Sequence, residues 1–533
     1  MENVMESPPI RFSSCRGISF EIKPHGDPFA IPKSAKEDEP NFRPLSISYW
    51  NMLQRSFSKA SSSSHFCDLD LDIHDPSYYV VDEELVDVVV TDRKLPRKSK
   101  KPSRLSVILL DQGLFTVYKM LFMFCFALNV VGLVLAATGH FPCARNRAAL
   151  FSIANIFFLT LCRSEALLRA VFWAAVKILG RSWVPIRIKT AATSLLQSLG
   201  GIHSGCGVSS VAWLIYSLVL TLNDWPHTSF EIVAVASAIL SFISFSCLAA
   251  FPVLRHLYHN VFERIHRFAG WAALGLLWAF VILTTSHDSK TASYNFQDGI
   301  ALKLVKSQEF WFTVAITVLI ILPWLTVRKV AVNLSSPSDH ASIVRFAGGV
   351  KPGILGRISP SPLSEWHAFG IISDGKTEHM MLCGAVGDFT KSLVSKPPSH
   401  LWVRGVHFAG LPYLVNMYDR VLLVATGSGI CVFLSFLLQP CRADVRVLWV
   451  AKGIEHNFGQ EIKDMATRYP KEKMIIHDTA SMGRPNVSKM SVEAAKKWGV
   501  EVVIVTSNPE GSRDVVNACK GVGIPAFGPV WDS

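Results

Sequence analysis

Long apolar runs, separated by short and often basic connectors, dominate the chain between residues 116 and 327. A helix needs about 20 apolar residues to cross a bilayer core. Six runs meet that length, and the pattern therefore predicts a six-helix membrane bundle: 116–139, 148–170, 195–222, 229–252, 268–285 and 309–327. The second run is interrupted by Arg163 and Glu165. Because charges are costly at membrane depth, we expect these two to pair, to face the bundle interior or to lie at the interface.

The rhythm changes after residue 330. Short segments punctuated by Gly and Pro fill 331–418 and predict a β-barrel. Beyond it, β-rich runs alternate with helical stretches, which predicts a parallel, doubly wound α/β domain over 419–533. The β-rich runs are 421–425, 445–450, 474–476 and 502–505, and the helical stretches include 459–469 and 491–498. Ser491 and Gly499 are the expected N-cap and C-cap of the latter helix.

The first 105 residues lack sustained periodicity, contain several prolines and predict a mostly disordered cytosolic tail. One alternation at 78–90 suggests a strand or a docking segment for a protein partner. Seven Lys and Arg residues at 93–104 then precede the first membrane run. This cluster fits an anchor to anionic lipid, and equally a signal that only sets orientation.

Composition supports the same division. Hydrophobic residues make up 50% of the chain and charged residues 18%, as expected for a membrane protein with a soluble appendage. The net charge of +12 lies largely beside the apolar runs, so it indicates membrane topology rather than nucleic-acid binding. The basic connectors place both termini in the cytosol and make the chain an integral, multi-pass protein of the plasma membrane or an endomembrane.

The 11 cysteines are scattered, and none forms a Cys-x-x-Cys pair. This argues against a disulfide framework, a zinc site or an iron–sulfur cluster. The N-terminus also lacks the basic stretch and apolar core of a cleavable secretory signal.

Gly427-Ser428-Gly429 directly follows the run 421–425 and precedes an apolar stretch. In that place the glycines predict a turn that lets the backbone approach the pyrophosphate of a dinucleotide. The alternative is a glycine turn that serves tight packing only.

The order of these parts resembles the ferric reductase and NADPH oxidase superfamily, and most of all its TmpA-like branch of membrane flavoproteins in plants and fungi. The resemblance covers about residues 105–533. Segment 364–369 is similar to the family's His-Pro-Phe-Ser/Thr flavin motif, and 387–391 to its flavin-phosphate motif. Segment 483–486 is similar to its Gly-Arg-Pro element, and 527–533 to the ending of the TmpA-like branch. A flavodoxin-reductase-like module after the bundle is implied.

The resemblance implies FAD and NAD(P)H as cofactors and assigns roles to matching residues. His367 and Phe369 would line the isoalloxazine or its ribityl chain, and Gly387 and Thr390 would bind the FAD pyrophosphate. Gly427 and Gly429 would hold the NAD(P)H pyrophosphate, with Arg484 or Lys452 at the adenosine phosphate. Arg484 is alternatively a solvated loop charge, and His367 an ordinary half-buried barrel histidine.

Two departures from the family are evident. Gly370 stands where the family has a Ser or Thr hydroxyl near the flavin. Thr506 and Ser507 stand where the last strand usually ends in Cys-Gly-Pro, with Ser507 as the hypothetical catalytic substitute for the thiol. These changes favour FAD binding over rapid NAD(P)H oxidation.

The relatives with two haems carry two histidines on each of the third and fifth helices. Here His203 and His266 occupy the inner positions, whereas Tyr216 and Ala279 stand 13 residues further on. One haem b held by His203 and His266 is one interpretation. The other is a haem-free bundle in which both are interfacial polar residues.

These observations predict a membrane-bound, FAD-dependent oxidoreductase that moves electrons from cytosolic NAD(P)H to an unidentified acceptor. The alternative is a catalytically weak or inactive flavoprotein with a regulatory role. A transporter with a soluble regulator fits less well, because the sequence has no inverted repeat.

Overall fold

The computed structural model describes residues 11–13, 19–21, 116–251, 254, 259–288, 291, 293–295 and 299–529. The chain divides into two units, Met1–Ser63 and Ser64–Ser533. In the first, β1 (Arg11–Ser13) pairs antiparallel with β2 (Ser19–Glu21), within the tail expected to be mostly disordered. The segment 78–90 and the basic cluster 93–104 lie outside the described residues.

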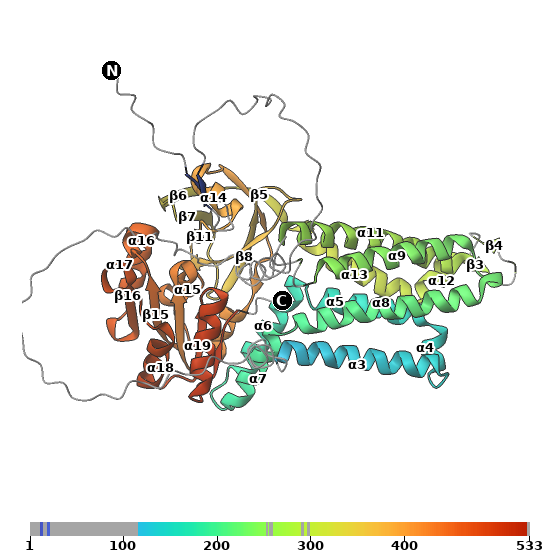
Figure 1. Ribbon diagram of the computed structural model, residues 1–533, viewed down its shortest axis with the longest axis horizontal. Helices are drawn as coiled ribbons and strands as arrows, with labels where there is room; N and C mark the ends of the chain where they lie inside the picture. Colours follow the sequence, from blue (N-terminus) through green and yellow to red (C-terminus); the bar gives the residue numbers. More distant parts are fainter. Residues whose placement is uncertain are drawn as a thin grey trace, which may run out of the picture. The chain divides into compact units, whose positions relative to one another are not determined.

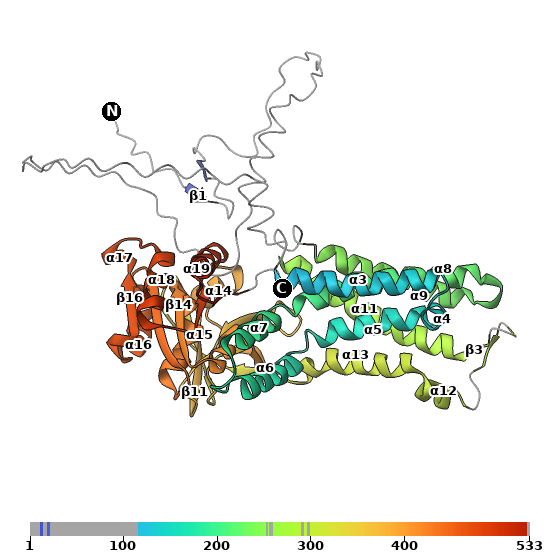
Figure 2. The same cartoon turned by 90° about the horizontal axis from the view of Figure 1, so that it is seen from below.

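Long apolar helices make up the region 116–325 (Figures 1 and 2). By length and composition, five of the described helices could cross a membrane. They are α3 (Val117–Ala137), α8 (Gly200–Asn223), α9 (Phe230–Ala249), α11 (His259–Ser286) and α13 (Gln308–Leu325). The shorter helices are α4 (Pro142–Asn146), α7 (Ile186–Gln197) and α12 (Ile300–Lys306).

The second predicted span, 148–170, is not one straight helix. α5 (Ala148–Leu161) ends before Arg163, and α6 (Glu165–Leu179) leaves it at an angle of 65°. Ser164 begins the new helix, since its hydroxyl accepts a hydrogen bond from the backbone N–H of Leu167. The count therefore reaches six only if this bent pair is taken as one span.

Helix α8 packs against α3, α5 and α9. Its glycines allow the closest of these contacts. A Cβ atom at Gly201 would lie 2.1 Å from Tyr118 O, and one at Gly205 would lie 2.9 Å from Phe122 O. Small residues permit such backbone approach between membrane helices, so α3 and α8 fit together only with glycine at these positions.

The barrel begins at β5, directly after α13. One sheet has the order β10-β11-β7-β6 and the other β13-β8-β12-β5, with β9 pairing β8. The strands are β5 (Val327–Ala331), β6 (Asn333–Ser338), β7 (Ala341–Ala347), β8 (Ile354–Ser359), β9 (His367–Gly370), β10 (Ile372–Ser373), β11 (Glu378–Gly384), β12 (His400–Arg404) and β13 (Phe408–Ala409). Helix α14 (Asp388–Ser395) follows β11, and η3 (Leu411–Met417) leads out of the barrel.

The predicted alternation of strand and helix is confirmed in the C-terminal region. Its parallel sheet has the order β16-β15-β14-β17-β18, built from β14 (Arg420–Thr426), β15 (Asp444–Ala451), β16 (Met474–Asp478), β17 (Val502–Thr506) and β18 (Ala526–Phe527). One face packs on α15 (Cys431–Leu438) and α16 (Ile454–Thr467), the other on α18 (Val487–Trp498) and α19 (Pro509–Gly521). The remaining short helix is α17 (Thr479–Met482).

The caps of α18 were predicted only in part. Gly499 ends the helix in the left-handed conformation, with φ +56°, as expected. The predicted N-cap Ser491 is wrong, because α18 begins four residues earlier. Asn486 is the N-cap and accepts the Lys489 backbone N–H, while the Ser491 hydroxyl donates to Val487 O inside the helix.

Candidate flavin and nucleotide site

The carboxyl ends of β14 and β17 meet where the order of the strands reverses, since β14 lies between β15 and β17. In open parallel sheets, ligands bind outside the carboxyl ends at such a switch point. Thr426 ends β14 and Ser507 follows β17, and their hydroxyl oxygens lie 2.7 Å apart. Ser507 is only 3% exposed, so its hydroxyl contacts Thr426 rather than solvent.

The turn 427–429 connects β14 to α15 through η4 (Gly427–Ile430). Gly427 has a φ of +53°, a conformation that favours glycine. A Cβ atom at Gly429 would lie 2.6 Å from Thr506 O. Backbone conformation accounts for Gly427 and packing for Gly429, and a bare backbone at the start of α15 is also what a pyrophosphate requires.

Lys452 and Arg484 follow the carboxyl ends of β15 and β16, and both are exposed. Asp478 ties these loops together by accepting hydrogen bonds from the backbone N–H groups of Gly453, at 2.7 Å, and Ile454, at 2.9 Å. Burial alone would raise the pKa of Asp478, but these backbone hydrogen bonds outweigh it and the pKa is lowered. An adenosine phosphate at this edge would thus bind beside a fixed carboxylate.

His367 begins β9 and stacks on Phe389 of α14, with ring centroids 4.4 Å apart and planes 8° apart. Both side chains are half-buried. Phe369, two residues further on, is buried in the hydrophobic core instead. The parallel pair of His367 and Phe389 offers a flat aromatic surface on which a flavin or adenine ring can stack.

Gly387 and Thr390 lie together at the start of α14. The Thr390 hydroxyl accepts the backbone N–H of Gly387 at 3.0 Å and that of Val386 at 3.1 Å, and it donates to Gly387 O. The groups expected to hold the FAD pyrophosphate therefore bind one another. A pyrophosphate would use the other N–H groups of this helical turn.

The end of β9 joins the barrel to the nucleotide domain. A Cβ atom at Gly370 would lie 2.4 Å from Val432 Cγ1 and 2.9 Å from the Val432 backbone nitrogen. Ser435 of α15 donates to Ile371 O at 2.6 Å and accepts the Ser373 backbone N–H. β9, which carries the expected flavin motif, thus packs directly against α15, the helix that follows the 427–429 turn.

On its other side, β9 adjoins the helical bundle. Trp366 precedes His367, and its ring centroid lies 6.4 Å from that of Trp324 at the end of α13. The Arg404 guanidinium lies 4.8 Å from the Trp366 ring and donates to Glu165 at 2.9 Å. Glu165 is 7% exposed, so it lies at the interface of α6 with the barrel.

Helix α7 contacts the junction of the barrel and the nucleotide domain. The Thr193 hydroxyl and Tyr418 OH lie 2.6 Å apart, and burial raises the pKa of Tyr418. Lys189, 2% exposed, places its Nζ 3.9 Å from the Asp419 carboxylate. Helix α7 thus binds the junction of the barrel and the nucleotide domain through buried polar contacts.

His203 of α8 and His266 of α11 face each other, with ring centroids 6.2 Å apart. The Nδ1 atom of His203 lies 2.9 Å from Leu159 O, and that of His266 lies 2.6 Å from the Ser246 hydroxyl. Two imidazoles that bind one iron from opposite sides at about 2 Å have ring centres roughly 6 Å apart. Such outer partners on Nδ1 are typical of histidine ligands that use Nε2.

Further along α8, around Trp213, aromatic and amide side chains fill the bundle. Trp213 is 1% exposed, donates to Asn129 Oδ1 at 2.9 Å and stacks on Phe151 at 4.7 Å. Asn155 donates to the same Asn129 oxygen at 2.8 Å. Tyr216, where the resemblance to the ferric reductase superfamily would imply an outer histidine, packs on Trp213. The position at which that resemblance would imply a second haem is therefore filled by packed side chains.

Sequence patterns did not assign four residues to the site: Phe389, Thr426, Asp478 and Trp366. Phe389 lies inside the 387–391 motif, so its aromatic type was a usable signal. Thr426 and Asp478 each end a strand of the parallel sheet, which is where ligands bind. Nothing in the sequence indicates the contact of Trp366 with Trp324.

Comparison with known proteins finds similarity to reductases. Residues 411–533 match the family model of the C-terminal domain of adenylate-forming reductase 03009. Over 432 residues the chain is 34% identical to adenylate-forming reductase 03009 of Coprinopsis cinerea and 33% identical to its adenylate-forming reductase 06235. The match covers 80% of this chain but 41% of each relative. Neither relative is named as a ferric reductase, so that branch stays a prediction.

Solved structures resemble the chain only distantly. A flavohemoglobin from Malassezia yamatoensis with bound FAD and heme shares 11% identity, at a TM-score of 0.33 over 57% of this chain and 97% of its own. Phthalate dioxygenase reductase shares 12% identity, at a TM-score of 0.28 over 38% and 67%. These similarities are too slight to support an argument.

Proposed function

We propose that the chain is an integral membrane flavoprotein oxidoreductase that accepts electrons from NAD(P)H on the cytosolic side. The observation that supports this most is the contact of Gly370 with Val432. This contact joins β9, which carries the expected flavin motif, to α15, which follows the 427–429 turn. A flavin bound at β9 and a nicotinamide dinucleotide bound at the start of α15 would therefore meet at the same edge. The reductase names of the relatives agree with this activity.

The residues present suit FAD in part. His367 and Phe389 supply a stacking surface, and the start of α14 supplies backbone N–H groups. FAD, when bound, converts a two-electron donor into one-electron steps. The chain's own residues position the two ligands, whereas no hydroxyl at position 370 contacts the flavin edge.

The helices and their charges support a membrane setting. Arg264 and Arg267 of α11 bind Glu365 and the carbonyl groups of Leu363 and Ser364 in the barrel. Basic residues thus gather on the barrel side of the bundle, which by the positive-inside rule supports a cytosolic location for that side. The plasma membrane or an endomembrane would hold the protein.

One haem b between His203 and His266 belongs to the same proposal. Their spacing of 6.2 Å and their Nδ1 partners fit bis-histidine ligation. Held by these two histidines, haem would supply one-electron redox chemistry.

The second candidate is a regulatory flavoprotein with little turnover. It is favoured by the engagement of Thr390 with Gly387 and by the burial of Ser507. Both observations remove polar groups that a fast reductase would use. The N-terminal tail would then bind a protein partner.

Purified full-length protein in detergent separates the two candidates. The proposed reductase is yellow and loses its visible flavin absorbance when NADPH or NADH is added without oxygen. The variant Phe389→Ala should lose most of its flavin, whereas His400→Ala, which changes an exposed residue at the start of β12, should keep it. Yellow protein that does not bleach supports the regulator, and colourless protein that cannot be loaded with FAD contradicts both.

A further inference from the structure

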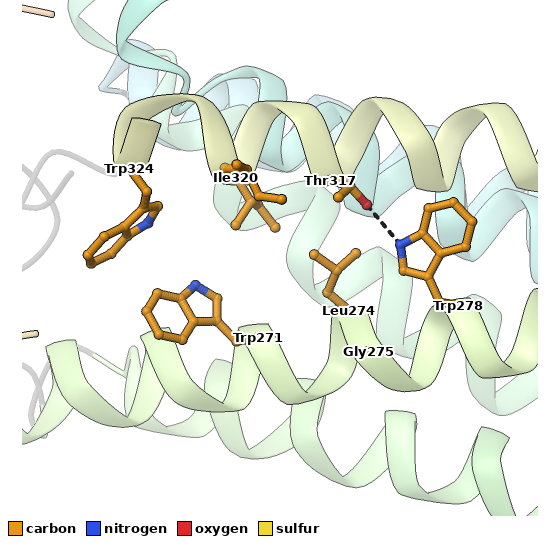
Figure 3. Close-up of a pocket in the computed structure, with 8 residues that line it drawn as sticks. Trp271, Leu274, Gly275, Trp278, Thr317, Ile320 and Trp324 are labelled. Atoms are coloured by element: carbon orange, nitrogen blue, oxygen red, sulfur yellow. Dashed lines mark hydrogen bonds between the residues drawn. The ribbon is translucent and has the colours of Figure 1, made fainter. Parts of the chain in front are cut away.

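A groove runs between α11 and α13 and ends beside the barrel. It has a volume of about 390 Å³ and is lined mainly by indole and aliphatic side chains. Figure 3 shows these side chains pointing from the two helices into the gap between them: Trp271, Leu274 and Trp278 of α11, and Thr317, Ile320 and Trp324 of α13. The volume is within the range of small-molecule sites.

Polar groups are confined to the two ends of the groove. At one end, Trp278 Nε1 donates to the Thr317 hydroxyl at 3.0 Å, and that hydroxyl donates to Thr313 O. Both groups are therefore satisfied. At the other end, the rings of Trp271 and Trp324 lie 5.1 Å apart, with their indole nitrogens toward the gap (Figure 3).

Within the described part of the chain, neither of these two indole N–H groups has a hydrogen-bond acceptor. An indole N–H in an apolar setting usually finds a partner. Two guanidinium groups, those of Arg267 and Arg404, lie 5.9 and 5.8 Å from the Trp324 ring. The groove therefore suits a ligand with oxygen acceptors on a flat ring at the Trp271 and Trp324 end and an apolar tail toward Trp278.

The position of this end is the second argument. Trp324 contacts Trp366, which precedes His367 in the expected flavin site. Electrons that leave the barrel toward the outer half of the bundle meet the packed cluster around Trp213 instead of a second haem. An acceptor that dissolves in the membrane and docks at the Trp271 and Trp324 end avoids that obstacle.

We propose that this groove binds a lipid-soluble quinone, which the protein reduces; the proposal rests on the reductase function above. The reaction balances as NAD(P)H + H⁺ + quinone → NAD(P)⁺ + quinol. The nicotinamide loses a hydride, two O–H bonds form on the quinone, and the additional proton comes from water at the cytosolic end. The apolar tail occupies the groove beside Leu274, Gly275 and Ile320.

Gly275 allows a specific test, because a Cβ atom there meets nothing within 4 Å. Gly275→Leu places an aliphatic side chain in the groove, and its Cβ atom meets no neighbour. Gly270→Leu is the matched control, since Gly270 lies on the same helix, has the same free space and is outside the lining. Full-length protein in phosphatidylcholine nanodiscs is equilibrated with tritiated decylubiquinone, and NADPH oxidation is followed with decylubiquinone or with ferricyanide.

We expect saturable quinone retention above that of empty nanodiscs, reduced at least tenfold in Gly275→Leu and less than twofold in Gly270→Leu. Quinone reduction should fall by the same factor, while ferricyanide reduction stays within twofold. Trp271→Phe, which keeps a ring but loses the N–H, should raise the KM for quinone three- to tenfold. The proposal is overturned if the protein retains no more quinone than empty nanodiscs do, or if Gly275→Leu and Gly270→Leu retain equal amounts. The groove would then be an ordinary lipid-filled groove. Absence of ferricyanide reduction in every variant refutes the reductase function instead, and the binding measurement still decides the groove.

Discussion

Gly370 and Val432 are in such close contact that no side chain fits between them, because a Cβ atom at Gly370 would lie 2.4 Å from Val432 Cγ1. A seryl or threonyl hydroxyl, which the resemblance to the ferric reductase superfamily implies at this position, is thus excluded by the packing of α15 against β9. The barrel and the nucleotide domain meet more closely here than a seryl side chain allows.

Gly370→Ser should therefore destabilise the protein rather than restore a catalytic group. Overpacking a tight contact costs about 1–3 kcal/mol, so we expect a lower midpoint of thermal unfolding and no faster flavin reduction. Gly521→Ala is the control, since a Cβ atom there meets nothing within 4 Å. A Gly370→Ser protein of unchanged stability and faster hydride transfer would contradict this account.

Glu165→Ala should loosen the bundle from the barrel. Glu165 is buried and pairs with Arg404 and Arg357, and removal of one partner from a buried pair costs about 3–5 kcal/mol. Limited proteolysis should cut between α6 and α7 faster, and the midpoint of thermal unfolding should fall. Glu455→Gln, which breaks an exposed pair with Lys463, should change neither measurement appreciably.

The barrel should lose stability as the pH falls from about 6.5 to about 4. Burial, followed by the charges of His379, Arg169 and Arg328, lowers the pKa of His407 to about 4. In this pH range the unfolded chain binds a proton at His407 that the folded chain does not bind. The free energy of unfolding therefore rises with pH over the same range. Unfolding midpoints at pH 7.5 and 4.5 should differ less in His407→Gln than in the parent or in His400→Gln. Equal pH dependence in all three proteins would rule out His407 as the cause.

A catalytic role of Ser507 can be tested by comparing mutations of Ser507 and of its hydrogen-bond partner Thr426. Ser507→Ala and Thr426→Val each remove the hydrogen bond between these two hydroxyl groups, at a cost of about 1–3 kcal/mol, so both should lower the unfolding midpoint. If Ser507 orients the nicotinamide, only Ser507→Ala should lower kcat, by tenfold or more, and Ser507→Cys should restore it. Equal kcat values in Ser507→Ala and Thr426→Val would leave Ser507 a purely structural role.

The haem is tested by absorbance. Well-folded protein should show a Soret band, lost in both His203→Ala and His266→Ala and kept in His140→Ala, whose histidine is exposed next to α3. Ser246→Ala, which removes only the Nδ1 partner of His266, should keep the haem and shift its reduction potential. A parent protein without the band, even after growth with added haem precursor, would mean a haem-free bundle.

Sequence patterns predicted the elements whose signal is local. Four strands of the parallel sheet, β14 to β17, were located because continuous apolar runs between turn residues are typical of buried strands, whereas the two-residue β18 was not predicted. Four helices that are long and apolar enough to cross a membrane, α3, α8, α9 and α13, end within a few residues of their predicted bounds, although α8 begins five residues after the predicted start. The start of α11 was missed because its first turns are polar and leave the apolar run.

Features that depend on distant partners were not predictable. The break at Arg163 and Ser164 is stabilised through Glu165 by Arg404, which is 239 residues away in sequence. The internal hydrogen bonds of Thr390 likewise depend on the turn geometry and not on the motif. Sequence could therefore identify the residues of the site, but not which of their polar groups are already engaged.

The cluster of Trp213, Asn129 and Phe151 also bears on energetics. A carrier that sends electrons through the full thickness of a bilayer works with or against the membrane voltage, at about 2.3 kcal/mol per charge per 100 mV. With that half of the bundle tightly packed, turnover at the cytosolic end would move almost no charge through the field. We therefore expect an electroneutral enzyme whose rate is indifferent to depolarisation.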